Sequence, residues 1–219
     1  MSLIAKVVSL LIGYGFGLFQ TAFIYSKIKG GDIRKVGSGN SGTTNALRSY
    51  GKKAGVLVLI GDLFKCIFAI LVARVIFAGG DAEMGRLVGL YAGLGVILGH
   101  NFPFYMKFKG GKGICSTLGI AIMFWWPLGI VACIIFFSII AATHYVSVGS
   151  LVALSATCSA AVILSLTGMV PVGQENMAQV VILFLIIIFL GFFQHRGNIK
   201  RLATHSERKT YIFKKNKES

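Results

Sequence analysis

Charged residues are scarce in this sequence, and acidic ones are the scarcest. Only 13% of the 219 residues are charged and seven are Asp or Glu, whereas 55% are hydrophobic and the mean hydropathy is +0.78. Soluble domains carry about 25% charged residues. This composition therefore excludes an ordinary soluble domain, and the long apolar runs indicate an integral membrane protein made of helices.

Neither the cysteines nor the spacing of possible metal ligands indicates a disulfide or a metal site. The four cysteines (Cys66, Cys115, Cys133 and Cys158) show no close pairing and lie in or beside apolar runs, where they are expected as small packing residues. No His, Cys, Asp or Glu cluster has the spacing of a metal site, so we expect no metal and no cofactor. The first apolar run is too long for a signal-peptide core and no cleavage site follows it, which predicts an uncleaved first span.

The positive charge is concentrated in three patches. Of the 22 Lys and Arg residues, 18 lie in residues 27–53, 100–113 and 195–219, and the formal net charge is +15. Because this charge sits between apolar runs and is not spread over a folded surface, it does not indicate a nucleic-acid partner. The positive-inside rule places all three patches in the cytoplasm.

The apolar runs predict a single all-α membrane domain, residues 1–219, with seven transmembrane helices. The predicted spans are about 3–25, 54–78, 86–99, 114–126, 127–143, 150–168 and 177–194. Residues 86–99 would make only about 21 Å of helix, less than the roughly 30 Å hydrocarbon core, so they and 114–126 are either thin spans or re-entrant.

Residues 114–143 form either one long helix or two helices with a break at Trp125-Trp126-Pro127. The positive charge favours the break. It keeps all three basic patches on one side of the membrane, whereas one long helix over residues 114–143 would put the basic tail outside, against the charge rule. We therefore predict seven crossings, with the N-terminus outside and the C-terminus in the cytoplasm. Five crossings are the alternative. Asp62 and Lys65, three residues apart in the second span, are expected to form a structural pair in the membrane.

The first polar segment, residues 37–48, reads GSGNSGTTNALR. It combines glycines, hydroxyls and amides with an arginine just before an expected helix. Arginine offers a planar fork of donors that suits phosphate, and Ser, Thr and Asn add neutral hydrogen-bond groups. A flexible linker is the alternative, although two asparagines and a terminal arginine favour a binding loop.

The second segment, residues 99–113, reads GHNFPFYMKFKGGKG. Glycines let backbone N–H groups approach a ligand, and a lysine among them supplies a positive charge. A helix beginning at Gly113 would also direct its N-terminus at the loop. The segment is not a Walker A loop, because Lys112 is followed by glycine. The alternative is a charged turn that only fixes the topology.

The third segment, residues 194–202, reads QHRGNIKRL at the end of the last span, and alone it is typical of a basic stop-transfer flank. Together, the three segments supply many cations and neutral donors but few carboxylates. A phosphorylated ligand fits that balance, and lipid-facing walls would suit an acyl tail.

In this order and spacing, SGNSGTTNALR, GHNFPFYMKFKGGKG and HRGNIKRL resemble the three signature motifs of the acyl-phosphate:glycerol-3-phosphate acyltransferases, the PlsY family. The resemblance implies a seven-helix enzyme of the bacterial cytoplasmic (inner) membrane. Such an enzyme moves a fatty acyl group from a long-chain acyl phosphate to glycerol 3-phosphate, releasing lysophosphatidic acid and inorganic phosphate. It also implies an active site on the cytoplasmic side and, as a partner, the soluble enzyme that makes acyl phosphate.

The resemblance assigns roles to residues of the three motifs and of the loop at 144–149. Catalytic roles fall to Ser38, Arg48, Lys112, His195 and Asn198, and substrate-binding roles to Asn40, Thr44, Asn45, His100, Gly110, Gly111, Gly113 and Ser147. For His100 the alternative is a histidine that caps a helix end, and for His195 it is a flank residue at the membrane interface.

The sequence favours direct acyl transfer without an acyl-enzyme. No histidine is followed by an aspartate five residues later, which argues against the His–Asp dyad of other acyltransferases. Arg48 and Lys112 would then clamp phosphate, and the proton would go to His195 or to the donor's own phosphate. The alternative functions are a transporter of phosphorylated metabolites, which needs cations near the midplane, and a non-catalytic anchor for anionic lipids.

Overall fold

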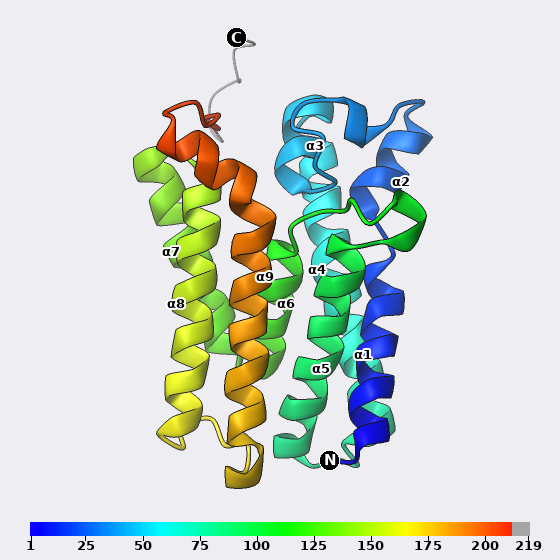
Figure 1. Ribbon diagram of the computed structural model, residues 1–219, viewed down its shortest axis with the longest axis vertical. Helices are drawn as coiled ribbons and strands as arrows, with labels where there is room; N and C mark the ends of the chain where they lie inside the picture. Colours follow the sequence, from blue (N-terminus) through cyan, green and yellow to red (C-terminus); the bar gives the residue numbers. More distant parts are fainter. Residues whose placement is uncertain (212–219) are drawn as a thin grey trace.

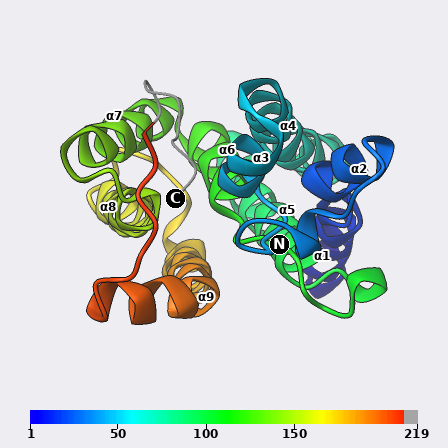
Figure 2. The ribbon, with the colours of Figure 1, turned by 90° about the horizontal axis from the view of Figure 1, so that it is seen from above.

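The computed structural model describes residues 1–211, and this part of the chain folds into helices and turns without a β-strand. The α-helices are α1 (Leu3–Gly17), α2 (Thr21–Ile28), α3 (Thr43–Tyr50), α4 (Lys52–Phe77), α5 (Ala82–Asn101), α6 (Ile114–Phe124), α7 (Trp126–Thr143), α8 (Val146–Leu166) and α9 (Met177–Ala203). Figure 1 shows an upright bundle in which α1 begins at the lower end and α9 finishes at the upper end. Seen from above, α7, α8 and α9 form one group beside α1 to α6 (Figure 2).

Much of the bundle surface is apolar. Six stretches of the described chain are long and apolar enough to cross a membrane: Leu3–Ile28, Lys52–Phe77, Ala82–Met106, Trp126–Thr143, Val146–Leu166 and Gln174–Ala203. The seventh apolar helix, α6, has only 11 residues. Large side chains such as Val75 and Phe189 are 83% and 65% exposed. Lipid accommodates such a surface and water does not.

The polar segments gather at the upper end of the bundle, which we call the α3 end. It carries α3, the turn after α5 and the chain beyond α9, whereas the α4–α5 and α8–α9 connections lie at the other end (Figure 1). The basic patches therefore share one end of the bundle. Lys214, Lys215 and Lys217 of the third patch lie outside the described residues.

The first span is not one continuous helix, contrary to the prediction for residues 3–25. It breaks between Gly17 and Thr21. The buried Gln20 side chain lies in the break, where its Nε2 donates to the carbonyls of Gly17 at 3.2 Å and His100 at 3.0 Å. One amide thus bonds to carbonyls at the ends of two helices, where intrahelical partners are missing.

Helix α5 is longer than the predicted span of residues 86–99. Asp81 caps its start by accepting from the backbone N–H groups of Glu83 and Met84, so the helix begins at Ala82. It continues through His100 and Asn101, both of which are buried inside the bundle. The His100 ring contacts Lys65, whereas the amide atoms of Asn101 have no hydrogen-bond partner among the described residues. Its 20 residues remove the reason for treating this element as a thin or re-entrant piece.

Other helices include polar residues that the sequence predicted to lie in loops. Arg48 lies inside α3 and not before a helix, Ser147 lies in the first turn of α8 and not in a loop, and α9 continues past the predicted residue 194 to Ala203. The third motif is therefore helical. Helix α6 ends at Phe124 and α7 begins at Trp126, at the position of the expected break.

Glycines allow α1 and α5 to pack backbone to backbone. A Cβ on Gly13 would lie 1.9 Å from the carbonyl oxygen of Ala92, and one on Gly95 would lie 2.1 Å from that of Leu10. Small residues at such contacts are typical of helices that associate within lipid. This packing fixes the end of α5, from which the second polar segment emerges.

Candidate functional site

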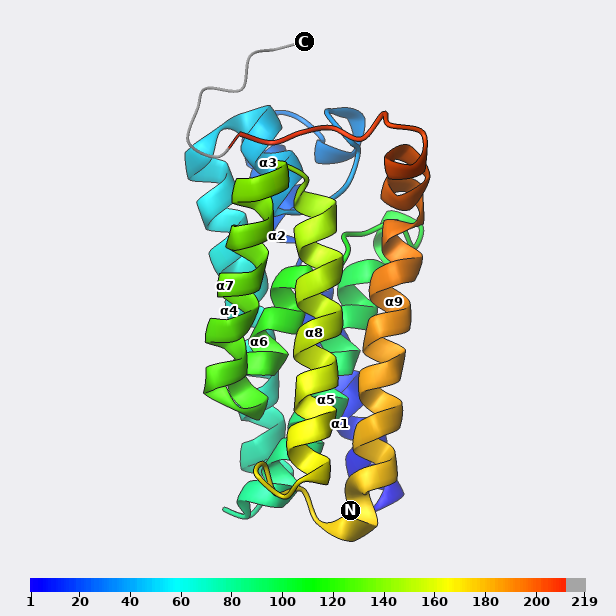
Figure 3. The same cartoon turned by 90° about the vertical axis from the view of Figure 1, so that its left-hand side faces the viewer.

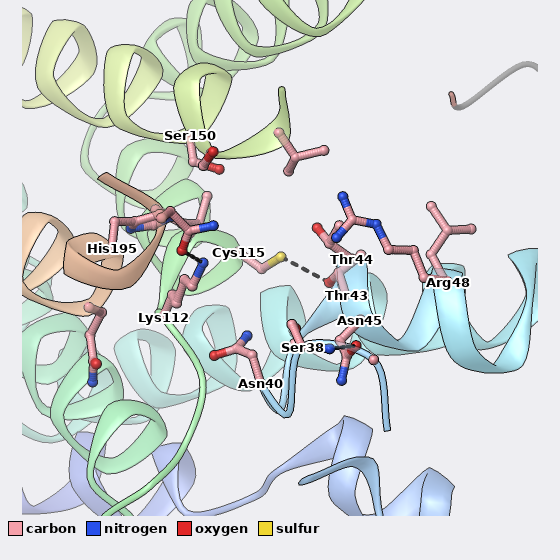
Figure 4. A pocket seen from close by; sticks show the side chains of 18 of the residues that line it. Ser38, Asn40, Thr43, Thr44, Asn45, Arg48, Lys112, Cys115, Ser150 and His195 are labelled. Carbon is pink, nitrogen blue, oxygen red and sulfur yellow. Dashed lines mark hydrogen bonds between the residues drawn. The ribbon is translucent and has the colours of Figure 1, made fainter. Parts of the chain in front are cut away.

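A cavity of about 1130 Å³ opens at the α3 end of the bundle. Its walls come from α3 and the turn before it, from α4, from the turn between α5 and α6, and from α7, α8 and α9. Ligand pockets usually measure about 300–1,000 Å³, so this cavity has room for more than one small reactant. Figure 4 shows Arg48 on one side of it and Lys112 with His195 on the other.

The structure brings together residues that the sequence placed in separate segments. All of the predicted site residues except Gly111 line the cavity: Ser38, Asn40, Thr44, Asn45, Arg48, His100, Gly110, Lys112, Gly113, Ser147, His195 and Asn198. The walls also include residues that sequence reasoning did not select, among them Thr43, Cys115, Ser150 and Glu207.

Asn45 organises the first segment. Its Oδ1 accepts from the backbone N–H of Ser38 at 2.9 Å, and its Nδ2 donates to the carbonyls of Ile33 at 3.2 Å and Val36 at 3.0 Å. These bonds occupy its amide, so Asn45 shapes the turn that carries Ser38 toward the cavity (Figure 4).

Arg48 faces the cavity from α3 and is held there by the chain that follows α9. Its Nη2 donates to the carbonyl of Arg208 at 3.1 Å and also contacts the hydroxyl of Thr210. Burial is the main cause that lowers the pKa of Arg48, but a guanidinium stays protonated at any physiological pH. Arg48 therefore supplies a fixed positive charge.

Residues 206–211 cross the α3 end from α9 toward α7 and α3, as the red segment in Figures 2 and 3 shows. The backbone N–H of Thr210 donates to the carbonyl of His144 at 2.8 Å, which fastens this segment to the end of α7. Sequence reasoning missed the segment, because its contacts join residues far apart in the chain.

Glu207 brings a carboxylate into a cavity that was expected to hold few. It accepts from Ser147 Oγ at 3.0 Å and Asn198 Nδ2 at 2.6 Å on one oxygen, and from Arg201 Nε at 2.7 Å on the other. Burial by itself would raise the pKa of Glu207, but the hydrogen bonds outweigh burial and lower it. The carboxylate is thus ionised and orients Ser147 and Asn198. Its position as an acid within a basic patch was the one signal available in the sequence.

Lys112 joins the second motif to the third. Its Nζ donates to Oδ1 of Asn198, whose other amide atom contacts Glu207. Burial lowers the pKa of Lys112 to about 8; the Glu207 carboxylate opposes this shift, and the positive charges of Arg201 and Arg48 add to it. Helix α6 begins at Ile114, just after Lys112 and Gly113, and Gly113, Ile114 and Cys115 line the cavity, so the N-terminus of α6 faces it.

The glycines before Lys112 do not act as the sequence suggested. The N–H groups of Gly110 and Gly111 donate to the carbonyls of Asn101 and His100, both at 3.0 Å. These two amides are therefore not available to a ligand. The glycines instead allow close packing, since a Cβ on Gly110 would lie 2.0 Å from the carbonyl oxygen of His100 and one on Gly111 would lie 2.0 Å from its Nε2.

His195 and Asn198 lie three residues apart on one face of α9, and both are buried. Nδ1 of His195 lies 2.7 Å from the carbonyl oxygen of Gly191. Because a carbonyl can only accept, Nδ1 carries a hydrogen, and in the neutral ring Nε2 then holds a lone pair. His195 is therefore arranged to accept a proton or a hydrogen bond through Nε2.

One wall of the cavity is apolar. Val56 and Leu59 of α4 face the same space as Phe136, Phe137 and Ile140 of α7. The cavity thus combines a cationic part near Arg48 and Lys112 with an apolar part between two lipid-facing helices. Such a combination can hold a molecule with a charged head and a hydrocarbon chain. Among the described residues, no group of three or more His, Cys, Asp or Glu side chains is placed to bind a metal.

Comparisons with known proteins agree with one another. Residues 7–205 match the family described as glycerol-3-phosphate acyltransferase. The chain is 39% identical over 206 residues to glycerol-3-phosphate acyltransferase 2 of Thermotoga maritima, covering 94% of this chain and 96% of that protein. It is 35% identical to the glycerol-3-phosphate acyltransferase of Clostridioides difficile, with 95% and 97% covered.

Two solved structures have the same fold. Both are crystal structures of PlsY (YgiH), an integral membrane glycerol 3-phosphate acyltransferase. The glycerol 3-phosphate form superposes with a TM-score of 0.80 at 30% identity, covering 95% of this chain and 99% of that one. The lysophosphatidic acid form gives 0.77 at 28% identity, covering 94% and 95%.

Proposed function

Because the chain belongs to the glycerol-3-phosphate acyltransferase family, we propose that it transfers a fatty acyl group from acyl phosphate to glycerol 3-phosphate at the α3-end cavity. The products are lysophosphatidic acid and inorganic phosphate. The observation that carries the proposal is that Arg48, Lys112 and Asn198, from three separate motifs, line one cavity with an apolar wall. The related PlsY was crystallised in a glycerol 3-phosphate form and a lysophosphatidic acid form, which supports the same acceptor and product here.

The reaction proceeds by direct attack. The acceptor's hydroxyl oxygen bonds to the carbonyl carbon of the acyl phosphate, the bond from that carbon to the phosphate oxygen breaks, and phosphate leaves with the electron pair. An acyl phosphate is a mixed anhydride, so the enzyme's main tasks are positioning and charge stabilisation. Arg48 and Lys112 supply positive charge. The hydroxyl proton goes to Nε2 of His195 or to the leaving phosphate. An acyl group trapped on Ser38 would overturn direct transfer.

The topology that fits this reaction has seven crossings of the bacterial inner membrane, with α6 as a short fourth crossing and the N-terminus outside. The basic patches then share the cytoplasmic side, as the positive-inside rule requires. Water-soluble glycerol 3-phosphate reaches the cavity from the cytoplasm, and the acyl chain lies along the apolar wall between α4 and α7.

The pH dependence of kcat/KM for glycerol 3-phosphate tests the role of Lys112. The pKa of Lys112 is about 8, so its ammonium loses a proton as the pH rises through that value, while the substrate phosphate, with a second pKa of about 6, stays dianionic. We expect kcat/KM to fall above pH 8. In Lys112→Arg the side chain stays charged, so this fall should vanish even if the absolute activity is lower. A fall of the same shape in both proteins would contradict this role.

The proposed function is tested with purified protein in lipid vesicles, given palmitoyl phosphate and glycerol 3-phosphate. We expect equal amounts of lysophosphatidic acid and inorganic phosphate. If product formed only when palmitoyl-CoA replaced palmitoyl phosphate, acyl phosphate would not be the donor. Uptake of glycerol 3-phosphate without product would favour a transporter, although the cavity opens at the α3 end of the bundle, whereas transporters bind substrate near the middle of the membrane.

A further inference from the structure

Three buried ionisable side chains, which the reaction described above does not use, lie near the turn that carries Gly110 and Gly111. Asp62 and Lys65 of α4 and His100 of α5 are 2%, 5% and 3% exposed. Buried ionisable groups within a membrane-spanning segment are costly and are frequently functional. Asp62 and His100 line the cavity, whereas Lys65 does not.

The ammonium of Lys65 has three hydrogen-bond partners. They are the carbonyl of Phe19 at 2.8 Å, Oδ1 of Asp62 at 2.8 Å and Nδ1 of His100 at 2.7 Å. An ammonium has three donors and cannot accept. Nδ1 of His100 must therefore accept, which places the ring's hydrogen on Nε2.

The Nε2 edge of His100 faces the glycine turn beside the cavity. It has no hydrogen-bond partner within residues 1–211, and a Cβ on Gly111 would lie 2.0 Å from it. Glycine at this position leaves the donor uncovered. His100 and His195 both line the cavity and have opposite neutral tautomers: Nε2–H of His100 is a donor, and Nε2 of His195 is an acceptor.

We propose that Lys65 is a positioning residue that fixes His100 as a neutral hydrogen-bond donor to a substrate phosphate or carbonyl oxygen. This inference rests on the proposed function only for the identity of the acceptor oxygen. Lys65 acts through His100 and does not touch the substrate. A neutral donor adds a hydrogen bond to the site without adding another cation to those of Arg48 and Lys112.

The tautomer can be measured in the wild-type protein without substrate. The chain has four histidines, so ¹⁵N-histidine labelling gives few ring resonances, and His100→Phe identifies those of His100. We expect an unprotonated, hydrogen-bonded Nδ1 and a protonated Nε2. The double variant Asp62→Leu/Lys65→Met removes both charges at once, a change that buried pairs often tolerate, and the single tautomer should be lost. A protonated Nδ1 in the wild type would overturn the proposal, whether or not the variant folds.

Kinetics then tests whether Lys65 acts through His100. We expect His100→Phe and Asp62→Leu/Lys65→Met each to lower kcat/KM for glycerol 3-phosphate by about 10- to 100-fold, the range for one hydrogen bond to a charged group. The combination should cost no more than either alone, because both remove the same interaction. Losses that multiply would overturn the proposal.

Arg74→Met is the matched control for these variants. Arg74 is a partly buried cation at the opposite end of α4, where it donates to the carbonyls of Gly85 and Met123. It should leave kcat/KM unchanged and the His100 tautomer intact, and a change in that tautomer would count against Lys65 as its cause. If the wild type forms no lysophosphatidic acid, the proposed function fails, while the resonances of His100 still decide the role of Lys65.

Discussion

Replacing Lys112 with methionine is expected to lower kcat/KM for glycerol 3-phosphate by about 100- to 1,000-fold, the loss found when one charge-stabilising donor is removed from an active site. Lys112 is half-buried, contacts Asn198 and faces the cavity with Arg48. Its charge therefore acts in a region where water screens it poorly. Methionine keeps most of the side-chain volume, so the packing of the turn should survive.

Lys53→Met provides the control for this variant. Lys53 is exposed on the same end of the bundle and does not line the cavity, so the net charge changes equally while the site keeps its lysine. We expect wild-type activity. Equal losses in the two variants would mean that the general positive charge of this face, and not the clamp at Lys112, attracts the substrate.

We expect Gly111→Ala to lower the activity by about 100-fold, although it adds only one methyl group and Gly111 does not line the cavity. The added Cβ would lie 2.0 Å from Nε2 of His100 and 2.8 Å from the carbonyl oxygen of Ser41. Both neighbours are buried, so the turn that carries Lys112 must shift. Displacement of a catalytic group by about 1 Å can cost about 100-fold in rate.

Gly15→Ala is the matched control for this methyl group. Nothing lies within 4 Å of a Cβ at Gly15, and alanine is a better helix former than glycine. Activity and thermal stability should both be retained. Retained activity in Gly111→Ala would show that the turn can move without affecting the site, contrary to the packing described here.

The chemistry of the site could be predicted from the sequence better than its geometry. Arg48, Lys112 and Asn198 stand out because cations and amides are rare in so apolar a chain, and the positive-inside rule places them on one side of the membrane. Glu207 was missed, because only the return of residues 206–211 across the bundle brings it to Ser147 and Asn198. No local pattern encodes such a contact.

Helix ends were mispredicted where the bundle buries polar residues. Polarity at His100 and Asn101 suggested that the span ended at residue 99, yet α5 includes both residues. Lys65 contacts the His100 ring and Gln20 contacts its carbonyl. The N–H groups of Gly110 and Gly111 donate to the last carbonyls of α5, so these glycines do not present their amides to a ligand. A pattern of residue types cannot distinguish these two uses of glycine.

A structure of the protein with bound glycerol 3-phosphate tests the central claim most directly, namely that three separate motifs form one phosphate site at the α3 end. The account predicts the ligand's phosphate within hydrogen-bond distance of Lys112, in the cavity lined by Arg48 and Asn198, with its glycerol hydroxyl toward the apolar wall. A phosphate bound elsewhere, for example beside Arg74 at the opposite end of the bundle, would contradict it.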